Sequence, residues 1–169
     1  MKQGDRSAFE HIVAETSVAL VRLGARMLGN VSDAEDIVQE TYLRAHRALV
    51  DGQFDGRSSV RTWLYRITSN LAIDALRSRK RQRVVSDDRA VGVSDGLAAA
   101  EARVALTELD DWLSVLPAEQ RAALTLSVME GFPNAEIARI LGCSEGAVEQ
   151  RLVRARTTLR SSIRSTDDD

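Results

Sequence analysis

Residues 61–83 read RTWLYRITSNLAIDALRSRKRQR, and the rest of the chain is organised around this stretch. Three- and four-residue spacing predicts a helix whose apolar face is formed by Val60, Trp63, Leu64, Ile67, Leu71 and Ala75. Roughly opposite lie Arg61, Tyr65, Thr68 and Ala72, and only the second half of the helix is expected to pack on both sides. Its end carries a basic run: Arg77, Arg79, Lys80, Arg81 and Arg83. Two interpretations stay open: a core helix with a solvated basic end, or a helix that holds a phosphate backbone and touches bases.

The composition limits the class of protein. The 169 residues leave room for one domain or two small ones, and abundant Ala, Leu, Arg and Glu predict an all-α fold. The net charge of −2 excludes a globally basic DNA-binding protein but allows a locally basic face. The single cysteine, Cys143, cannot form an internal disulfide, which fits a cytoplasmic protein. No membrane-spanning run and no signal-peptide core are recognised.

Two helices are expected before the opening stretch. The first spans residues 5–29, and the second begins with a predicted capping box formed by Ser32 and Glu35. Four side chains of the second helix share a face distinct from its apolar one, because they follow i, i+3, i+4, i+7 spacing: Asp36, Gln39, Glu40 and Leu43. This stripe is either a solvated face or a docking surface for a basic partner.

Two segments are expected to be irregular. Residues 50–59 form a predicted loop with two glycines and a lone Phe54. Residues 84–98 lose the helical period and are rich in Ser, Asp and Gly, which predicts a flexible linker between two domains. Acids predominate from Asp87 to Glu119. This acidic stretch either folds back on the basic helix or, as the favoured interpretation, is a solvated spacer.

The remainder predicts a helix-turn-helix. Helices are expected over residues 99–116 and 118–130, with Trp112 among the apolar positions of the first and Val128 among the inward-facing positions of the second. A short helix over 134–141, a Gly142-Cys143 turn and a helix from 145 to about 163, with Ser144 as N-cap, complete the pattern. Many proteins enter a major groove in this way, although helix-turn-helix geometry also occurs in proteins that bind no DNA.

Three segments together resemble bacterial sigma factors of the extracytoplasmic-function type. They are DAEDIVQETYLRAHRAL (33–49), FDGRSSVRTWLYRITSNLAIDALRSRKR (54–81) and LPAEQRAALTLSVMEGFPNAEIARILGCSEGAVEQRLVRARTTLR (116–160). The resemblance implies an all-α protein of two small helical domains. Residues 1–83 would bind the RNA polymerase core and the promoter −10 element. Residues 99–169 would bind the −35 element, with 84–98 as linker.

The resemblance also implies binding residues. The clamp helices of the polymerase largest subunit would meet the stripe of Asp36, Gln39, Glu40 and Leu43. The −10 element would be captured and held by Phe54, Arg57, Ser58, Arg61, Asn70, Arg77, Lys80 and Arg81. The −35 element would be contacted by Ser144, Glu149, Gln150, Arg151 and Arg154. Gln can bond adenine, Glu can accept from cytosine, and Arg can bond guanine or phosphate, so these side chains suit the task. Promoter DNA, polymerase core and an anti-sigma factor are the implied partners, with no cofactor, metal or small-molecule substrate.

The chain departs from the family's sequence pattern at two places in the helix-turn-helix. Pro133-Asn134 stands where the family usually has Ser or Thr followed by an aromatic residue, which makes Asn134 a candidate N-cap. Glu149 is an acidic residue at a position where Lys or Arg is frequent.

Three other functions are less consistent with the sequence. A stand-alone helix-turn-helix regulator leaves the exposed stripe unexplained. A mimic that only titrates an anti-sigma factor would not need the basic run. An enzyme is not expected, because His11 and His46 are isolated from other catalytic or metal-binding residue types.

Overall fold

The structure, a computed structural model, describes residues 3–85 and 112–167. The predicted all-α fold is confirmed, and the described residues contain no strand. Its elements are α1 (Gln3–Leu28), α2 (Val31–Val50), α3 (Val60–Val85), α5 (Ala118–Leu124), the π-helical turn η1 (Thr125–Met129), α6 (Asn134–Leu141) and α7 (Glu145–Asp167). The expected linker overlaps α3 by its first two residues. Its remainder and most of the helix predicted over 99–116 lie outside the described residues.

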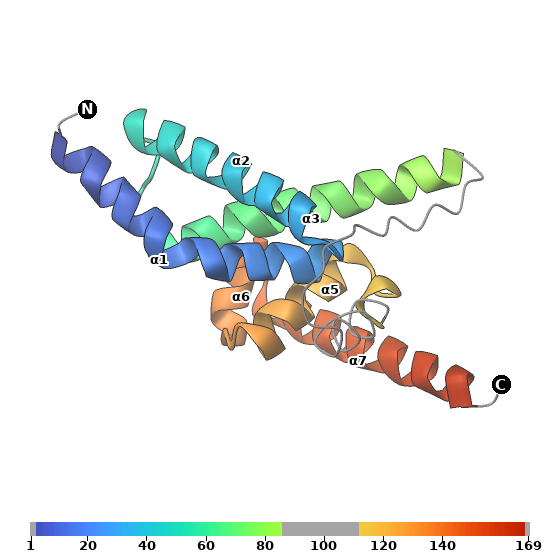
Figure 1. The fold of residues 1–169 in the computed structure, drawn as a ribbon. Coiled ribbons are helices and arrows are strands. Elements are labelled where there is room, and N and C mark those ends of the chain that lie inside the picture. The colour runs from blue at the N-terminus through green and yellow to red at the C-terminus, as the bar shows by residue number, and fades with distance from the viewer. Residues whose placement is uncertain (1–2, 86–111, 168–169) are drawn as a thin grey trace.

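Helices α1–α3 form an N-terminal group that packs around a common apolar core (Figure 1). Leu20 and Leu23 of α1 and Leu64 of α3 are fully buried, as the spacing predicts. Helices α1 and α2 approach closely where Gly24 meets Ala34. The predicted capping box is wrong: Asn30 is the N-cap of α2, and its side-chain oxygen accepts from the Asp33 backbone N–H at 2.7 Å. Asn30 prevails because it stands directly before the first helical residue, with its backbone extended.

Helices α5–α7 and η1 form a C-terminal group that contains the predicted helix-turn-helix. Helix α6 ends at Gly142, whose φ of 63° is the left-handed conformation that glycine favours. The predicted helix over 118–130 changes to a π-helical turn after Leu124. The wider turn rotates the following side chains, so Val128 is exposed instead of buried. Trp112, an apolar position of the helix predicted over 99–116, is half exposed.

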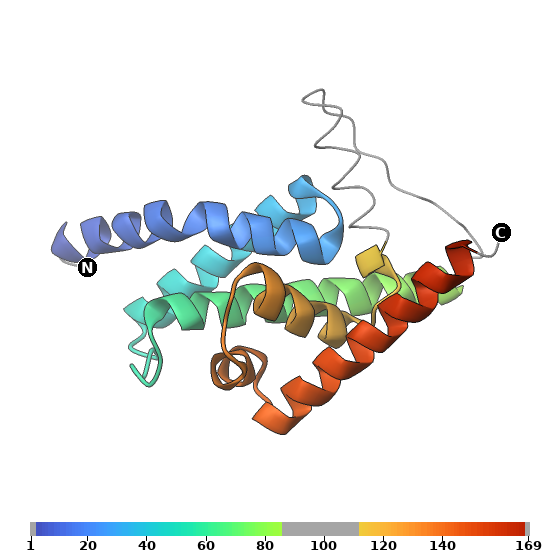
Figure 2. The same ribbon diagram turned by 90° about the horizontal axis from the view of Figure 1, so that it is seen from below.

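The two groups share one core. Helices α5 and α6 lie against α3, and α7 packs on α5 and α6 (Figure 2). The Tyr65 ring of α3 is fully buried and meets Phe132 edge-on, with ring centroids 4.8 Å apart. Thr68 and Ala72 are buried as well. Helix α3 therefore packs on both sides in its first half too, which corrects the one-sided interpretation of that half.

Candidate nucleic-acid and polymerase interfaces

The loop before α3 is held in place by the start of that helix. Ser59 caps α3, since its hydroxyl oxygen accepts from the Thr62 backbone N–H at 3.0 Å. The Phe54 ring packs on Trp63, with centroids 4.7 Å apart. Arg57 is almost fully exposed, and its guanidinium lies 3.5 Å from the Asp55 carboxylate. The loop therefore presents a cation on a braced backbone, and Trp63 acts as its support.

A cleft of about 750 Å³ separates this loop from the helix-turn-helix. The predicted −10 residues Phe54, Arg57 and Ser58 line one side of the cleft. The turn and the start of α7 line the other side, including the predicted −35 residue Ser144. Arg66 and Arg139 add two cations to the cleft that the sequence interpretation missed. The position of Arg66 three residues after Trp63 was the available signal, because that spacing puts both side chains on one helix face.

The basic run of α3 divides into side chains with different surroundings. Arg77 pairs with Asp74 of its own helix and with Glu119 of α5. Arg79 pairs with Asp33 and donates to the Leu28 carbonyl at 2.9 Å, so it joins α3 to α1 and α2. Asn70, Lys80 and Arg81 are exposed. Within the described part of the chain, neither Lys80 nor Arg81 forms an ion pair, so both remain available to phosphates.

Glu119 shows how one acid of the C-terminal group meets the basic helix. Partial burial opposes ionisation of its carboxyl group, but a backbone hydrogen bond and the Arg77 guanidinium outweigh that effect and lower its pKa. This contact favours, for Glu119, the fold-back that the sequence analysis treated as second choice. The other acids of that stretch lie outside the described residues.

The recognition helix α7 begins as predicted. The Ser144 hydroxyl oxygen accepts from the Ala147 backbone N–H at 3.2 Å. Glu149, Gln150 and Arg154 are exposed. Arg151 is half-buried and donates to the Cys143 sulfur at 3.1 Å, so it braces the turn.

The start of α6 departs from the expectation. Asn134 does not cap the helix: Pro133 occupies the N-cap position, and no side-chain hydrogen bond forms there. The Pro133 carbonyl instead accepts from the backbone N–H groups of Glu136 and Ile137. Asn134 is already the first helical residue, one position too late for its side chain to cap.

The predicted polymerase stripe lies on the outer face of α2. Asp36, Gln39 and Leu43 are exposed, and Leu43 keeps 52% of its surface in contact with solvent. Glu40 accepts from the Arg44 guanidinium at 2.7 Å, a partly exposed pair along the helix. The buried residues of α2 lie on its other face: Ala34, Val38, Thr41 and Ala45. The stripe is therefore an accessible surface that combines charge, an amide and an apolar side chain.

A polar cluster that no sequence pattern predicted joins the two helix groups. The Glu130 side chain is 2% exposed and accepts from the Tyr65 hydroxyl at 2.8 Å. The guanidinium groups of Arg22 and Arg26 lie 3.4 and 3.5 Å from the same carboxylate. We call these four residues the Glu130 cluster. Burial, followed by the hydrogen bond to Glu130, raises the pKa of Tyr65.

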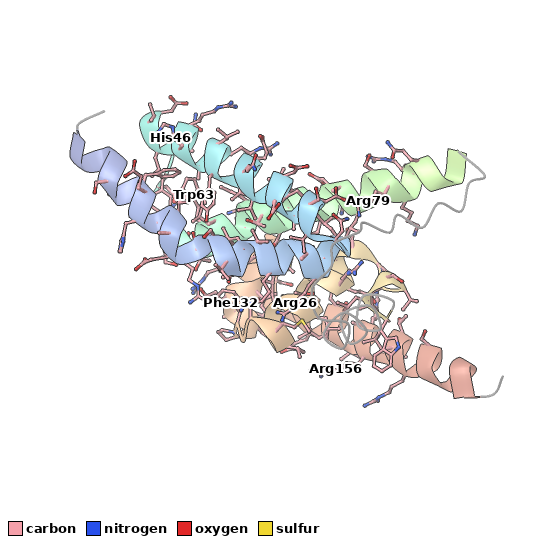
Figure 3. The ribbon with its side chains drawn as sticks, in the orientation of Figure 1. Arg26, His46, Trp63, Arg79, Phe132 and Arg156 are labelled. Carbon is pink, nitrogen blue, oxygen red and sulfur yellow. The ribbon has the colours of Figure 1, made fainter. Side chains whose placement is uncertain are left out.

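Further contacts border this cluster, and Figure 3 labels two of the residues involved, Arg26 and Phe132. Thr62 donates to the Glu136 carboxylate at 2.7 Å, and Arg121 donates to the Arg26 carbonyl at 3.1 Å. The Arg61 guanidinium lies 5.3 Å from the centre of the Phe132 ring. Arg61, a predicted −10 residue, therefore stacks on an aromatic ring of the C-terminal group.

The two histidines belong to the N-terminal group of helices. His11 pairs with Glu15 on the surface, and His46 packs edge-on against Phe9. In residues 3–85 and 112–167, no group of three or more His, Cys, Asp or Glu side chains is arranged to hold a metal. No helix in these ranges has the length and apolar character needed to cross a membrane.

Two protein-family models match the chain in sequence order. The model described as Sigma-70 region 2 matches residues 12–82, and Sigma-70, region 4 matches residues 106–159. The ECF RNA polymerase sigma factor SigW of Bacillus subtilis is 34% identical over 97% of this chain and 93% of its own length. SigM of Mycobacterium tuberculosis, also an ECF RNA polymerase sigma factor, is 38% identical over 92% of this chain and 77% of its own.

Solved structures show the same similarity. The sigma factor RpoE, in complex with the anti-sigma factor NepR from Bartonella quintana, superimposes with a TM-score of 0.73 at 27% identity. That match covers 93% of this chain and 97% of RpoE. CnrH, in complex with the cytosolic domain of CnrY, gives a TM-score of 0.71 at 29% identity, covering 95% of this chain and 90% of CnrH.

Proposed function

Because the chain belongs to the ECF family of RNA polymerase sigma factors, we propose that it divides promoter recognition between two domains. Residues 1–83 bind the polymerase core and the −10 element, and residues 99–169 bind the −35 element. Residues 84–98 join the two. The observation that carries this proposal is the order of the two Sigma-70 matches along a chain that carries an exposed stripe, a basic helix and a helix-turn-helix.

The outer stripe of α2 is the proposed polymerase surface. Asp36 and Glu40 supply negative charge on a rigid helix, and Leu43 supplies an exposed apolar contact. A charged rim around an apolar contact suits a specific protein–protein interface. The proposed partner surface is the clamp helices of the polymerase largest subunit.

The braced loop and the exposed polar side chains of α3 are the proposed −10 surface. A base that leaves the stack costs a few kcal/mol, which stacking and edge hydrogen bonds must offset. Phe54, Ser58 and Asn70 provide aromatic, hydroxyl and amide groups for that purpose. Arg57, Lys80 and Arg81 provide exposed cations for the phosphates. Arg61 and Arg77 supply two further cations for the phosphates when Arg61 is released from the Phe132 ring and Arg77 from the Glu119 carboxylate.

The exposed face of α7 is the proposed −35 surface. Gln150 and Arg154 lie one helical turn apart and can follow a groove wall. The Glu149 carboxylate can accept a hydrogen bond from cytosine N4. Its negative charge also weakens the attraction of this surface to DNA phosphates. Ser144 holds the helix start, and Arg151 braces the turn, so both position this surface.

The remaining roles follow from the family. Sigma factors are transcription initiation factors, and we propose no catalytic chemistry for this chain. We propose that it acts in the cytoplasm and is regulated by an anti-sigma factor, because RpoE is bound to the anti-sigma factor NepR in its structure. A stand-alone helix-turn-helix regulator is not favoured, because it leaves the match over residues 12–82 without a purpose.

Run-off transcription tests the proposal. Purified core polymerase, the full chain and a library of genomic fragments are combined, and the transcript starts are sequenced. Promoter-specific starts that share −10 and −35 motifs are expected. Core alone is the control. If core plus this protein gives no promoter-specific transcript on any genomic template, the proposed function is wrong.

A further inference from the structure

One side chain of the basic run, Arg79, anchors the end of α3 to the other two helices of the N-terminal group (Figure 3). Its guanidinium donates to the Leu28 carbonyl at 2.9 Å and pairs with the Asp33 carboxylate. Leu28 is the last residue of α1, and Asp33 lies in the first turn of α2. A single guanidinium therefore joins the end of α1, the start of α2 and the end of α3.

Both acceptors of Arg79 suit a guanidinium. The last carbonyls of an α-helix have no partner within that helix and lie at the negative end of its dipole, and the Leu28 carbonyl is one of them. The Asp33 carboxylate is itself held in place, because the Asn30 side-chain amide donates to it at 2.7 Å. The planar fork of an arginine can meet two such fixed acceptors at once, whereas the ammonium of a lysine is a single point of charge.

Arg79 faces the protein, in contrast to the two residues that follow it. Ala72, Leu76 and Arg79 have i, i+4, i+7 spacing and therefore share one face of α3. Ala72 is fully buried and Leu76 packs against the core, so this face points inward. Lys80 and Arg81 lie on other faces of the helix and are exposed.

The anchor is placed where α3 leaves the core. Up to Gln82, the last buried side chain of α3 is Ile73, and the final turns of the helix extend beyond the ends of α1 and α2 (Figure 1). Arg79 extends the contact with α1 and α2 by almost one turn beyond Leu76. The contact ends directly before Lys80 and Arg81, so it can fix the direction in which these two cations are presented.

We propose that Arg79 is a positioning residue of the −10 surface, which binds no phosphate itself but orients the helix end that carries Lys80 and Arg81. This inference rests on the proposed sigma-factor function. The side chains of Arg79 and Asp33 are 35% and 44% exposed, so water weakens their pair, and its loss should loosen the helix end without unfolding the N-terminal group. Apparent affinity for DNA then falls with the fraction of molecules in the competent orientation.

Hydrogen–deuterium exchange of the full chain tests the anchor without polymerase or DNA. Arg79→Ala and Asp33→Asn should each increase exchange about fivefold in peptides from residues 76–82 and leave peptides from residues 60–72 unchanged. Alanine has a higher helix propensity than arginine, so faster exchange in Arg79→Ala cannot come from propensity. Glu15→Gln, at an exposed acid on α1, is the matched control and should exchange like the wild type. Unchanged exchange at 76–82 in both anchor variants overturns the proposal.

Promoter binding at several salt concentrations tests the positioning role. Holoenzyme assembled from polymerase core and each variant is titrated with a fluorescent promoter fragment from the run-off experiment, opened at the −10 element. Arg79→Ala should bind about fivefold more weakly with the same slope of log Kd against log salt. Arg81→Ala should reduce that slope by ~0.7–0.9, the signature of one lost phosphate contact. Asp33→Asn should weaken binding as Arg79→Ala does, and Arg79→Lys should not restore the wild-type affinity.

A phosphate-binding Arg79 would give opposite results. The salt slope would fall in Arg79→Ala, Arg79→Lys would keep its affinity, and Asp33→Asn would bind as tightly as the wild type or more tightly, because it frees the guanidinium. Any of these results overturns the positioning role, as does unchanged affinity in Arg79→Ala.

The two measurements also separate this inference from the proposed function. If exchange at 76–82 increases but no promoter-specific transcript forms, the anchor stands and its role in promoter binding fails together with the proposed function. If transcription is promoter-specific while Arg79→Ala changes neither exchange nor affinity, the sigma-factor function stands and the positioning role is wrong.

Discussion

Gly24→Ala tests whether the N-terminal group depends on the close approach of α1 and α2. A Cβ at position 24 would lie 3.0 Å from the Ala34 Cβ and 3.2 Å from the Ala34 Cα. Carbon atoms in favourable contact lie ~3.5–4.0 Å apart, so the two helices would have to separate. Neither neighbouring atom can move away alone, because one is backbone and the other is a methyl group attached to it.

Two effects of opposite sign decide the magnitude. Alanine is more favourable than glycine inside a helix by ~1 kcal/mol. Overpacking of a well-packed core costs ~1–3 kcal/mol. The net expectation is a loss of about 1 kcal/mol in the free energy of unfolding, which corresponds to ~2–4 °C in Tm for a chain of this size. Gly146→Ala is the matched control, because a Cβ there meets no atom within 4 Å. It should stabilise by up to ~1 kcal/mol.

The measurement is thermal and urea unfolding followed by circular dichroism, with the double variant Gly24→Ala, Ala34→Gly added. Removing the Ala34 methyl relieves the shorter contact, so Gly24→Ala should be less costly in that background. If Gly24→Ala raises Tm as Gly146→Ala does, the helices are not held at contact distance by the glycine. The explanation of their packing would then be refuted.

Three further predictions concern the proposed function. Asn70→Ala should impair open-complex formation, measured by permanganate footprinting, more than binding to polymerase core; equal loss of both would instead indicate misfolding. Charge reversal by Asp36→Arg with Glu40→Arg should weaken core binding in a pull-down titration, whereas Glu15→Arg, at an exposed acid on α1 away from the stripe, should not. Unchanged affinity in the double variant would remove the docking role. Ser144→Ala should cost ~1 kcal/mol of stability through the lost N-cap and weaken −35 binding by mobility shift; an unchanged Tm would contradict the capping role.

The sequence predicted those features that depend on neighbouring residues. The short helix 134–141, the turn at Gly142-Cys143 and the Ser144 cap all lie as expected, because each needs only local backbone chemistry. The stripe on α2 was also correctly placed on an exposed face, since its spacing differs from that of the buried residues. Its role as a polymerase surface remains a prediction.

The features that the sequence did not predict depend on residues far apart in the chain. The Tyr65 side chain, for example, is in contact with Phe132 and Glu130 of the other group. The π-helical turn that exposes Val128 has no strong local signal, since no Pro or Gly interrupts residues 125–129. In the sequence, no pattern distinguishes Glu130 from an exposed acidic residue at the end of a helix, just before a glycine. Helical spacing identifies one buried face, but it cannot show that a second group of helices buries the other.

The arrangement also accounts for a negative net charge in a protein proposed to bind DNA. Acids of the C-terminal group meet cations of the N-terminal group across the interface: Glu130 faces Arg22 and Arg26, and Glu119 faces Arg77. Across this interface these opposite charges largely cancel within the molecule. Lys80 and Arg81 are exposed outside the interface, beside the surface where phosphates are proposed to bind. The net charge of −2 therefore describes the whole chain, whereas the field at the proposed DNA-binding surface depends on the cations that lie outside the interface.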